Sequence, residues 1–184
     1  LHLFDVTQAD LNWENPILRQ EIYRMMRYWL ELGVDGFRLD VINLISKQQN
    51  FVDDTLLTPT ADGRKFYTDG PRIHEYLHEM NHEVFALRDG LLTVGEMSST
   101  TLESCVLYTN PARKELDMVF NFHHLKVDYV GGEKWSLGRF DFIQLKQLFN
   151  TWQSGMQAGG GWNALFWSNH DQPRALSRFG DPIN

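Results

Sequence analysis

Hydrophobic residues along the chain follow two spacings, one typical of helices and one typical of strands. Apolar side chains recur every three or four positions over residues 17–30, after Asn15, which can cap a helix, and Pro16, which suits the first helical turn. The segment GFRLDV at 36–41 then alternates apolar and polar positions, as a strand with one buried face does. We therefore expect a helix that ends near Gly33 and a strand that follows it at once.

The same order of elements is repeated through the rest of the chain. The polar segment 46–70, with turn signals at Thr58-Pro59 and around Gly63, is predicted to be a long loop. After this loop we expect, in chain order, a helix from Pro71 to Phe85, a strand over 91–97, a short helix over about 100–108, a strand over 118–122, a helix over about 141–157 and a last strand over 163–167. Alternating helices and strands predict a parallel sheet covered by helices.

Two architectures fit this order, a doubly wound sheet and a (β/α) barrel. No glycine-rich phosphate loop follows a predicted strand, which argues against a nucleotide-binding sheet. A full barrel takes roughly 250 residues, and the chain has 184. We therefore expect an α/β chain that forms part of a (β/α)₈ TIM barrel, with about four parallel strands from its middle and later part. Residues 1–184 should be one fragment of the barrel domain with no second domain, cut from a longer protein, because the chain starts at Leu1 rather than Met and ends in a turn-rich stretch.

Composition narrows the classes of partner. The formal net charge of -7 argues against nucleic acid, and 42% apolar residues indicate a substantial core. No apolar run approaches the roughly 20 residues of a membrane span. The single cysteine, Cys105, excludes an intramolecular disulfide.

Acidic residues fall where the predicted strands end. Asp40 lies near the end of the first strand, Glu96 near the end of the second, and His170-Asp171 just after the last. In barrels, catalytic groups come from the carboxyl ends of different strands and point into one cleft. Arg38 lies on the same strand face as Asp40, one pleat away, and is expected to keep its carboxylate ionised.

This set of residues predicts acid–base chemistry on a sugar. An ionised Asp40 suits a nucleophile, whereas Glu96 in an apolar or carboxylate-rich surrounding should have a raised pKa and stay protonated. One ionised and one protonated carboxyl group are what cleavage of a glycosidic bond requires. Taken alone, an Arg–Asp pair such as Arg38–Asp40 is usually a structural salt bridge; three acidic groups at successive strand ends favour the chemical role.

Three motifs resemble those of a known family. GFRLDV, TVGEMS and WSNHDQPR are similar to the nucleophile, general-acid and stabiliser motifs of the α-amylase superfamily of retaining glycoside hydrolases. The resemblance implies that Asp40 is the nucleophile, Glu96 the acid/base and Asp171 the transition-state stabiliser, with the first two carboxyl groups roughly 5–5.5 Å apart. It also implies substrate contacts from three residues of the same motifs: Arg38, His170 and Arg174.

Further segments resemble one branch of this superfamily. QADLN at 8–12 is similar to the QPDLN motif of oligo-1,6-glucosidases, with Ala9 in place of proline. FYTDGPR and FNFHHLKVDYVGGEKW resemble trehalose-6-phosphate hydrolases, which implies a phosphorylated disaccharide substrate. Lys126 is then the first candidate for binding the phosphate, Lys134 a second, and His123 a substrate-facing residue. The alternatives are exposed, solubilising lysines and a structural histidine.

Two other functions stay open at this stage. An oligo-1,6-glucosidase or dextran glucosidase would use the same carboxylates on a neutral substrate, and a catalytically inactive sugar-binding relative would have lost one of them. We expect no cofactor and no metal, since His74, His78 and His82 recur at a spacing that can bind metal but lack a strand-end carboxylate. A phosphorylated sugar implies a cytoplasmic enzyme. Open sheet edges imply that the isolated chain self-associates and is inactive.

Overall fold

A parallel sheet with the strand order β1-β2-β3 lies at the centre of the molecule. Its strands are β1 (Gly36–Leu39), β2 (Leu92–Glu96) and β3 (Met118–Phe120). This computed structural model describes residues 1–55, 62–134, 136 and 138–180, so the predicted turn at Thr58-Pro59 and the end of the turn-rich terminus lie outside the described residues. The parallel strands confirm the predicted fold class.

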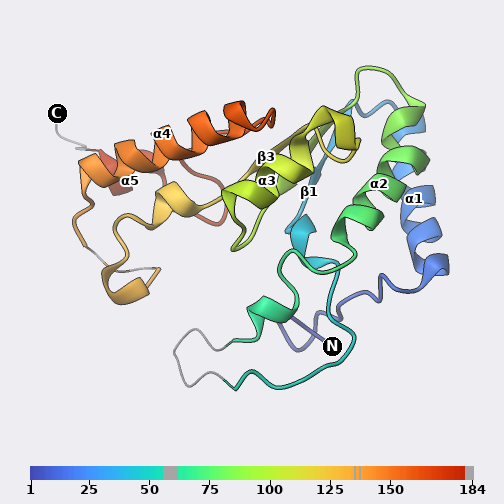
Figure 1. Cartoon of the computed structure of the whole chain (residues 1–184), viewed down its shortest axis with the longest axis horizontal. Coiled ribbons are helices and arrows are strands. Elements are labelled where there is room, and N and C mark those ends of the chain that lie inside the picture. The colour runs from blue at the N-terminus through green and yellow to red at the C-terminus, as the bar shows by residue number, and fades with distance from the viewer. Residues whose placement is uncertain (56–61, 135, 137, 181–184) are drawn as a thin grey trace.

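Helices connect and cover the strands. They are α1 (Pro16–Glu31), α2 (Ile73–Glu83), α3 (Leu102–Thr109), α4 (Phe142–Ala158) and α5 (Ala175–Phe179). Short 3-10 turns lie at η1 (Ile42–Leu44), η2 (Arg64–Phe66), η3 (Phe85–Leu87), η4 (Pro111–Arg113), η5 (His123–Lys126) and η6 (Val130–Gly132). In Figure 1, α1 and α2 lie together at one end and α4 lies at the other. No helix in the described part of the chain has the length and apolar content needed to cross a bilayer.

Helix α1 shows how the sequence pattern produces the packing. The Asn15 side chain accepts a hydrogen bond from the Ile17 backbone N–H at 3.0 Å and so caps the helix. The buried residues Arg19, Tyr23 and Met26 follow one another at helical spacing and form the inner face. Arg19 Nε lies 2.7 Å from Glu79 Oε2 of α2, so a partly buried ion pair connects these two helices.

The hydrophobic core lies between the helices and one face of the sheet. Its fully buried side chains include Tyr23, Tyr76, Leu77, Met80, Tyr108 and Val119. Burial of one such side chain contributes about 1.5–3 kcal/mol, so this face holds the strands in place. The opposite face is then available for polar groups, and it carries Arg38, Glu96 and Phe120.

Helices α3 and α4 approach each other closely through glycine. A Cβ atom on Gly155 would lie 2.3 Å from Leu102 Cδ2, and one on Gly159 would lie 2.5 Å from Val106 Cγ1. Both distances are well inside van der Waals contact, so side chains at these positions would push α4 away. The close packing holds α4 beside the loop that follows β3.

The predicted strand over 163–167 is wrong in extent. Only Asn163 pairs, through an isolated parallel bridge to Val119, with Val119 N–H donating to Trp162 O at 3.2 Å and Ala164 N–H donating to Val119 O at 2.8 Å. Strand β3 is only three residues long. Only one residue of the segment 163–167 therefore pairs with it. The described residues therefore form a sheet of three strands rather than four.

The first strand also ends earlier than predicted. Strand β1 stops at Leu39, and Val41 has a φ of 38°, in the left-handed region. A β-branched residue adopts this conformation rarely and at a cost in strain. The turn directs the chain into η1 and leaves Asp40 beyond the end of the strand.

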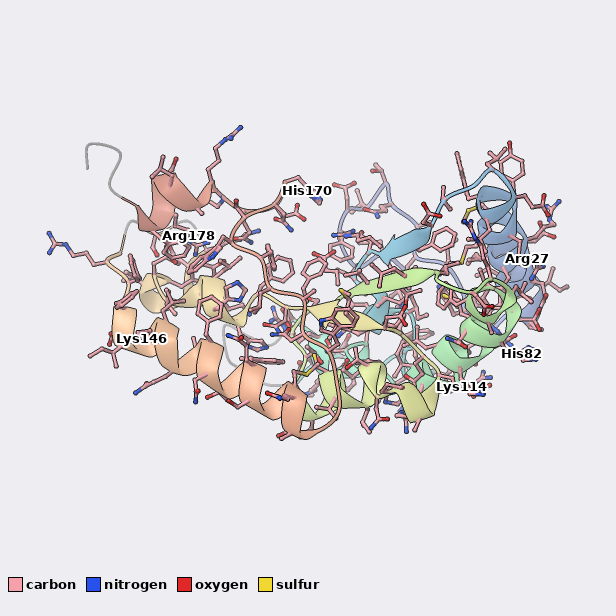
Figure 2. All side chains as sticks on the ribbon, turned by 90° about the horizontal axis from the view of Figure 1, so that it is seen from above. Arg27, His82, Lys114, Lys146, His170 and Arg178 are labelled. Atoms are coloured by element: carbon pink, nitrogen blue, oxygen red, sulfur yellow. The ribbon has the colours of Figure 1, made fainter. Side chains whose placement is uncertain are left out.

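Helix α5 was not predicted, because only five residues form it. Arg178 joins it to the loop after β3 (Figure 2), since its Nε donates to Asp128 Oδ2 at 2.6 Å and its Nη2 contacts Asp128 Oδ1. These contacts hold the segment that contains His170 against the body of the protein.

Candidate active site

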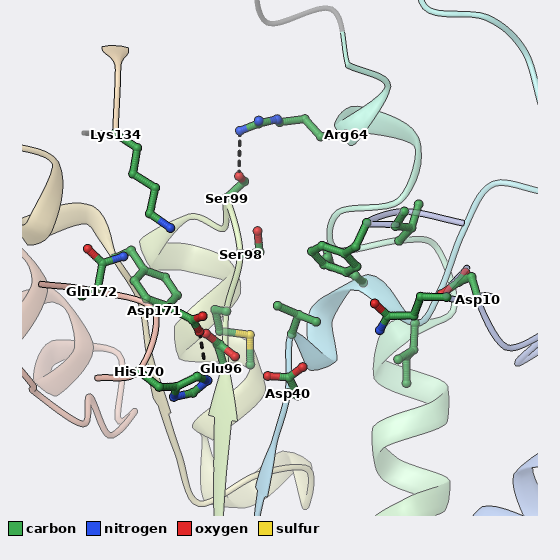
Figure 3. A pocket seen from close by; sticks show the side chains of 18 of the residues that line it. Asp10, Asp40, Arg64, Glu96, Ser98, Ser99, Lys134, His170, Asp171 and Gln172 are labelled. Carbon is green, nitrogen blue, oxygen red and sulfur yellow. Dashed lines mark hydrogen bonds and ion pairs between the residues drawn. The ribbon is translucent and has the colours of Figure 1, made fainter. Parts of the chain in front are cut away.

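A cleft of about 1130 Å³ opens at the carboxyl ends of the strands. Asp40 follows β1, Glu96 ends β2, and His170 and Asp171 come from the segment before α5 (Figure 3). Seven of the residues predicted for the site line this cleft: Asp40, Glu96, His123, Lys126, Lys134, His170 and Asp171.

Arg38 connects the first two carboxyl groups. Its Nη1 contacts Asp40 Oδ1, as the sequence predicted, and its Nη2 lies 2.5 Å from Glu96 Oε2. Arg38 pairs with Val94 in the register of the sheet, so Arg38 and Glu96 share one face. A guanidinium presents several donors in a fixed plane, and one such group holds both carboxylates near each other.

The environments of these carboxyl groups shift their pKa values in opposite directions. Hydrogen bonding with Glu96 lowers the pKa of Asp40 most, partial burial opposes this, and Arg38 lowers it further. Burial raises the pKa of Glu96 to about 7, helped by the hydrogen bond and the charge of Asp40 and opposed by Arg38. Asp40 is therefore ionised at neutral pH, and Glu96 holds a proton for much of the time.

The shifts have the predicted directions, and the structure adds a second contact. The sequence predicted that Arg38 keeps Asp40 ionised. In the structure the hydrogen bond with Glu96 is the largest single cause of the lowered pKa of Asp40, and Arg38 acts on Glu96 as well as on Asp40. This second contact was missed because strand register across 58 residues is not visible in the motif.

His170 and Asp171 form the third part of the site. His170 Nε2 lies 3.1 Å from Asp171 Oδ2, and both side chains are exposed in the cleft. The Asp171 backbone N–H donates to Asn169 Oδ1 at 2.9 Å, which closes a turn and directs the pair toward the cleft. A positive charge on His170 also lowers the pKa of Asp40, which indicates that these groups face one another.

His123 lines the cleft from η5. Its ring stacks on Trp152 with centroids 4.8 Å apart, and its Nε2 lies 2.9 Å from the Thr100 carbonyl oxygen. A carbonyl only accepts, so Nε2 carries the proton and donates. Burial lowers the pKa of His123, which keeps the ring neutral. Its neighbour His124 has a structural role, because it is buried and its Nε2 donates to Phe166 O at 2.7 Å.

Lys126 and Lys134 also reach the cleft. The Lys126 side chain keeps contact with solvent, but the cleft wall removes part of its hydration, and this desolvation lowers its pKa. The positive charge of Arg64 lowers the pKa of Lys126 further. Lys126 and Arg64 line the same cleft, although 62 positions separate them in the sequence.

Arg174 is not brought into this cleft. Arg174 is exposed, precedes α5 and is not among the residues that line the cleft. Its backbone carbonyl accepts from Arg178 N–H at 3.2 Å, so it starts a helix turn. Its place in the WSNHDQPR motif suggested a substrate contact, but adjacency in sequence does not say where a side chain points once the chain turns into a helix.

Several residues of the site were not predicted. The amide of Asn43, which is fully buried, donates to Ser98 O at 2.8 Å and to Asp69 Oδ1 at 2.9 Å, while its Oδ1 accepts from Ser98 N–H at 2.9 Å. Asp69 also accepts from Tyr108 Oη at 2.6 Å and from Thr100 Oγ1 at 3.0 Å. This network joins the loops after β1 and β2. The only signal in the sequence was an Asn among the apolar residues that directly follow GFRLDV.

The described residues contain no group of three or more His, Cys, Asp or Glu side chains arranged to hold a metal ion. The evenly spaced histidines of α2 have protein partners instead. His74 Nδ1 lies 2.7 Å from Glu115 Oε2, and His78 Nδ1 lies 3.1 Å from Arg113 O.

Parallel strands covered by helices, with acidic side chains from successive strand ends in one cleft, define a segment of a (β/α)-barrel enzyme domain. The model of the α-amylase family, described as the alpha amylase catalytic domain, matches residues 1–184. The chain therefore belongs to the α-amylase family.

Relatives of known name are similar over almost the whole chain. It is 66% identical over 181 residues to a trehalose-6-phosphate hydrolase of Bacillus subtilis (strain 168), covering 98% of this chain and 31% of that protein. It is 61% identical to the Escherichia coli (strain K12) trehalose-6-phosphate hydrolase, covering 98% of this chain and 32% of that protein. An oligo-1,6-glucosidase of Parageobacillus thermoglucosidasius is 49% identical, with coverage of 98% and 32%.

A solved structure gives the same result for the fold. The crystal structure of Bacillus licheniformis trehalose-6-phosphate hydrolase matches with a TM-score of 0.91 and 64% identity, covering 98% of this chain and 32% of that chain. The chain spans about a third of the length of the relatives that it matches. Its strands and helices thus correspond to a fragment of an α-amylase-family TIM barrel.

Proposed function

We propose that the full-length protein hydrolyses α,α-trehalose 6-phosphate to glucose and glucose 6-phosphate with retention of configuration. The main support is the pair of carboxyl groups held by Arg38, one ionised and one with a pKa near 7, in a cleft that also contains cationic side chains. The trehalose-6-phosphate hydrolases that are 61% and 66% identical support the substrate. Residues 1–184 would then be one segment of the barrel, with no second domain.

In this proposal the reaction takes place in two steps. Asp40 attacks the anomeric carbon while Glu96 donates its proton to the leaving glycosidic oxygen, which forms a glucosyl ester on Asp40. Glu96, now ionised, takes a proton from water, and the resulting attack releases glucose. Arg38 stays beside both groups throughout and limits the repulsion when Glu96 and Asp40 carry charge together.

Asp171 and His170 would hold the sugar in the first subsite. Asp171 accepts hydrogen bonds from ring hydroxyls that strengthen as the ring flattens toward an oxocarbenium-like transition state. His170, 3.1 Å from Asp171, would donate to a hydroxyl of the same ring. His123 would contact the second sugar as a neutral group, since burial lowers its pKa.

Lys126 and Lys134 are the proposed contacts for the phosphate group. Both line the cleft that contains the carboxylates. A phosphate carries nearly two negative charges at neutral pH and forms strong hydrogen bonds with ammonium groups. The lowered pKa of Lys126 indicates an incompletely solvated cation, which a bound anion would stabilise.

An oligo-1,6-glucosidase is the second candidate, since relatives with that name are 45–50% identical over a similar span. The carboxylates would act in the same way on a neutral α-1,6-glucoside. A catalytically inactive, sugar-binding relative is less well supported, because all three acidic residues are present and line one cleft.

Initial rates of the purified full-length enzyme with trehalose 6-phosphate, trehalose, isomaltose and 4-nitrophenyl α-glucoside test the proposal. We expect kcat/KM to be highest for trehalose 6-phosphate, and NMR to detect α-glucose as the first product. A preference for isomaltose would favour the second candidate, and β-glucose as first product would contradict the retaining mechanism. A phosphorylated disaccharide also supports a cytoplasmic location, and no cofactor is required.

A further inference from the structure

The cleft has an acidic part and a cationic part. The carboxyl groups of Asp40, Glu96 and Asp171 lie together, whereas Arg64 lies beyond Ser99 and Lys134 lies above Gln172 in the view of Figure 3. Arg64 comes from η2, in the loop between β1 and α2, and lies outside the three motifs that contain the acidic residues. A substrate with a sugar ring at one end and an anion at the other would match this division of charge.

Arg64 is held in a fixed orientation by protein contacts. Its Nε lies 2.8 Å from Asp62 Oδ2, its Nη2 lies 2.5 Å from the same oxygen, and its Nη1 donates to Ser99 Oγ at 3.0 Å. A guanidinium has five N–H donors, two of them on each terminal nitrogen. These contacts use one donor on each terminal nitrogen, so a second donor on each is available to a ligand.

Ser99 connects Arg64 with the catalytic strand. It lies three residues after Glu96, and its backbone has a φ of 53°, in the left-handed region that non-glycine residues adopt at a cost. Its hydroxyl accepts from Arg64 and still has its own hydrogen to donate. The turn after β2 therefore fixes the distance between the guanidinium and the proton donor of the site.

Lys126 is a further cation that lines the same cleft as Arg64. Next to desolvation, the positive charge of Arg64 is the other cause that lowers the pKa of Lys126. Like charges in one cleft repel each other, and an anion that contacts both of them reduces that repulsion. Asp62 carries one negative charge, and it contacts Arg64 on the Nε and Nη2 side. This contact offsets the charge of Arg64 and does not offset that of Lys126.

We propose that Arg64, oriented by Asp62 and Ser99, binds the phosphate group of the substrate together with Lys126 and thereby determines the preference for a phosphorylated sugar. This inference rests on the proposed function. Arginine binds two phosphate oxygens at once through its planar fork, which a lysine cannot do. Arg64 thus determines specificity and takes no part in the bond-breaking steps.

The test uses the full-length enzyme with Arg64→Gln and Arg64→Lys. The control is Arg88→Gln, because Arg88 is also exposed and paired with an aspartate, with its Nη2 2.8 Å from Asp35 Oδ1 and its Nη1 2.7 Å from Val34 O, at the amino end of β1. We expect Arg64→Gln to lower kcat/KM for trehalose 6-phosphate about ten-fold to a hundred-fold, the range of a charge-assisted hydrogen bond. Rates with trehalose and 4-nitrophenyl α-glucoside should change by less than about three-fold, and Arg64→Lys should recover part of the loss.

Inhibition by the product gives a second measurement. Arg64→Gln should raise the inhibition constant of glucose 6-phosphate by a similar factor and leave that of glucose unchanged. Equal losses with all three substrates would mean that Arg64 only maintains the loop, and an unchanged preference would mean that Lys126 and Lys134 suffice; either result overturns this inference but leaves the proposed function intact. If the unmodified enzyme shows no preference for trehalose 6-phosphate over trehalose, the proposed function itself fails.

Discussion

At the scale of single residues, exposure separates the two carboxyl groups that Arg38 contacts. The side chain of Glu96 is 4% exposed and that of Asp40 is 70% exposed. Removal from water disfavours a charged carboxylate, so the buried group keeps its proton to higher pH. The same arginine therefore contacts a carboxylate and a carboxylic acid at neutral pH. The burial of each carboxyl group decides which of the two keeps its proton.

The first prediction concerns pH. Because Glu96 must be protonated to act as acid and its pKa is raised from 4.5 to about 7, kcat/KM should fall as the pH rises through about 7. On the acid side, kcat/KM should fall only below pH 3.8, because the pKa of Asp40 is lowered from its ordinary value of 3.8. Trehalose should be the substrate for this measurement, since a phosphate monoester itself titrates near pH 6.

The linkage of Glu96 to stability has the same sign. A folded-state pKa above the unfolded value gives stability that is fully present below about pH 4.5 and is lost as the pH rises through about 7. For activity, the control is Glu96→Gln. If kcat/KM of this variant still falls as the pH rises through about 7, another group controls activity in this range.

The second prediction separates the roles of the carboxyl groups. Glu96→Gln should lower the glycosylation rate for trehalose by about 10²–10⁴-fold, the contribution of general acid catalysis, but should spare 4-nitrophenyl α-glucoside, whose leaving group needs little protonation. Asp40→Asn should abolish turnover of both substrates. Burst-phase kinetics measure the first step directly, and equal losses of that step on both substrates in Glu96→Gln would contradict its role as acid.

At the scale of elements, Asn43 joins the turns that follow β1 and β2. Its amide both donates to and accepts from the backbone of Ser98 and also donates to Asp69. Asn43 is fully buried, whereas Ser98 and Asp69 are partly buried. Since Ser98 follows Glu96 by two residues, the pair fixes where β2 ends relative to Asp40. A change here should alter the geometry of the site as well as stability.

The third prediction is that Asn43→Ala lowers the free energy of unfolding by about 2–4 kcal/mol, because buried partners lose their hydrogen bonds. The same variant should lower kcat for 4-nitrophenyl α-glucoside at least about ten-fold through misplacement of Glu96. Asn81→Ala is the control, since Asn81 donates to Glu115 O at 3.1 Å outside the cleft. Asn81→Ala should lower the free energy of unfolding without lowering kcat. If both variants changed kcat by the same factor, the proposed role of Asn43 would be contradicted.

The sequence predicted the elements with strong local signals and missed those set by distant contacts. Helix α1 has a cap, a proline and an apolar face, so its position was predicted almost to the residue. The segment at Asn163 has the composition of a strand, but its pairing depends on how far β3 extends. The carboxylates were found because strand ends converge in any parallel sheet. Arg64 was not predicted, and Arg174 lies outside the cleft, because the path of a loop decides where such side chains lie.

At the scale of the whole molecule, the sheet has open edges. Within the described residues, β1 pairs only with β2, and the outer side of β3 holds only the bridge to Asn163. Beside β1, a largely apolar groove is lined in part by Met25, Trp29 and Phe37. Unpaired strand edges next to apolar surface are templates for association.

The fourth prediction is therefore that the isolated 184-residue chain self-associates and has little or no hydrolase activity. Light scattering at micromolar concentration should give a mass that is a multiple of 21.5 kDa, and trehalose 6-phosphate should remain intact over hours. A stable monomer would refute the association. Turnover comparable to that of the full-length enzyme would refute the incompleteness of the site.

The bridge that Arg38 forms between Asp40 and Glu96 also has a kinetic meaning. It joins positions 58 residues apart in the chain, and Asp171 comes from a segment still further along. No local segment can assemble this site, so the entropy of closing large loops is lost before any catalytic contact forms. Helices such as α1 and α4 can form early from nearby residues. During refolding, catalytic activity should therefore return later than the helical circular dichroism signal. Activity then measures whether the strands have reached their native register.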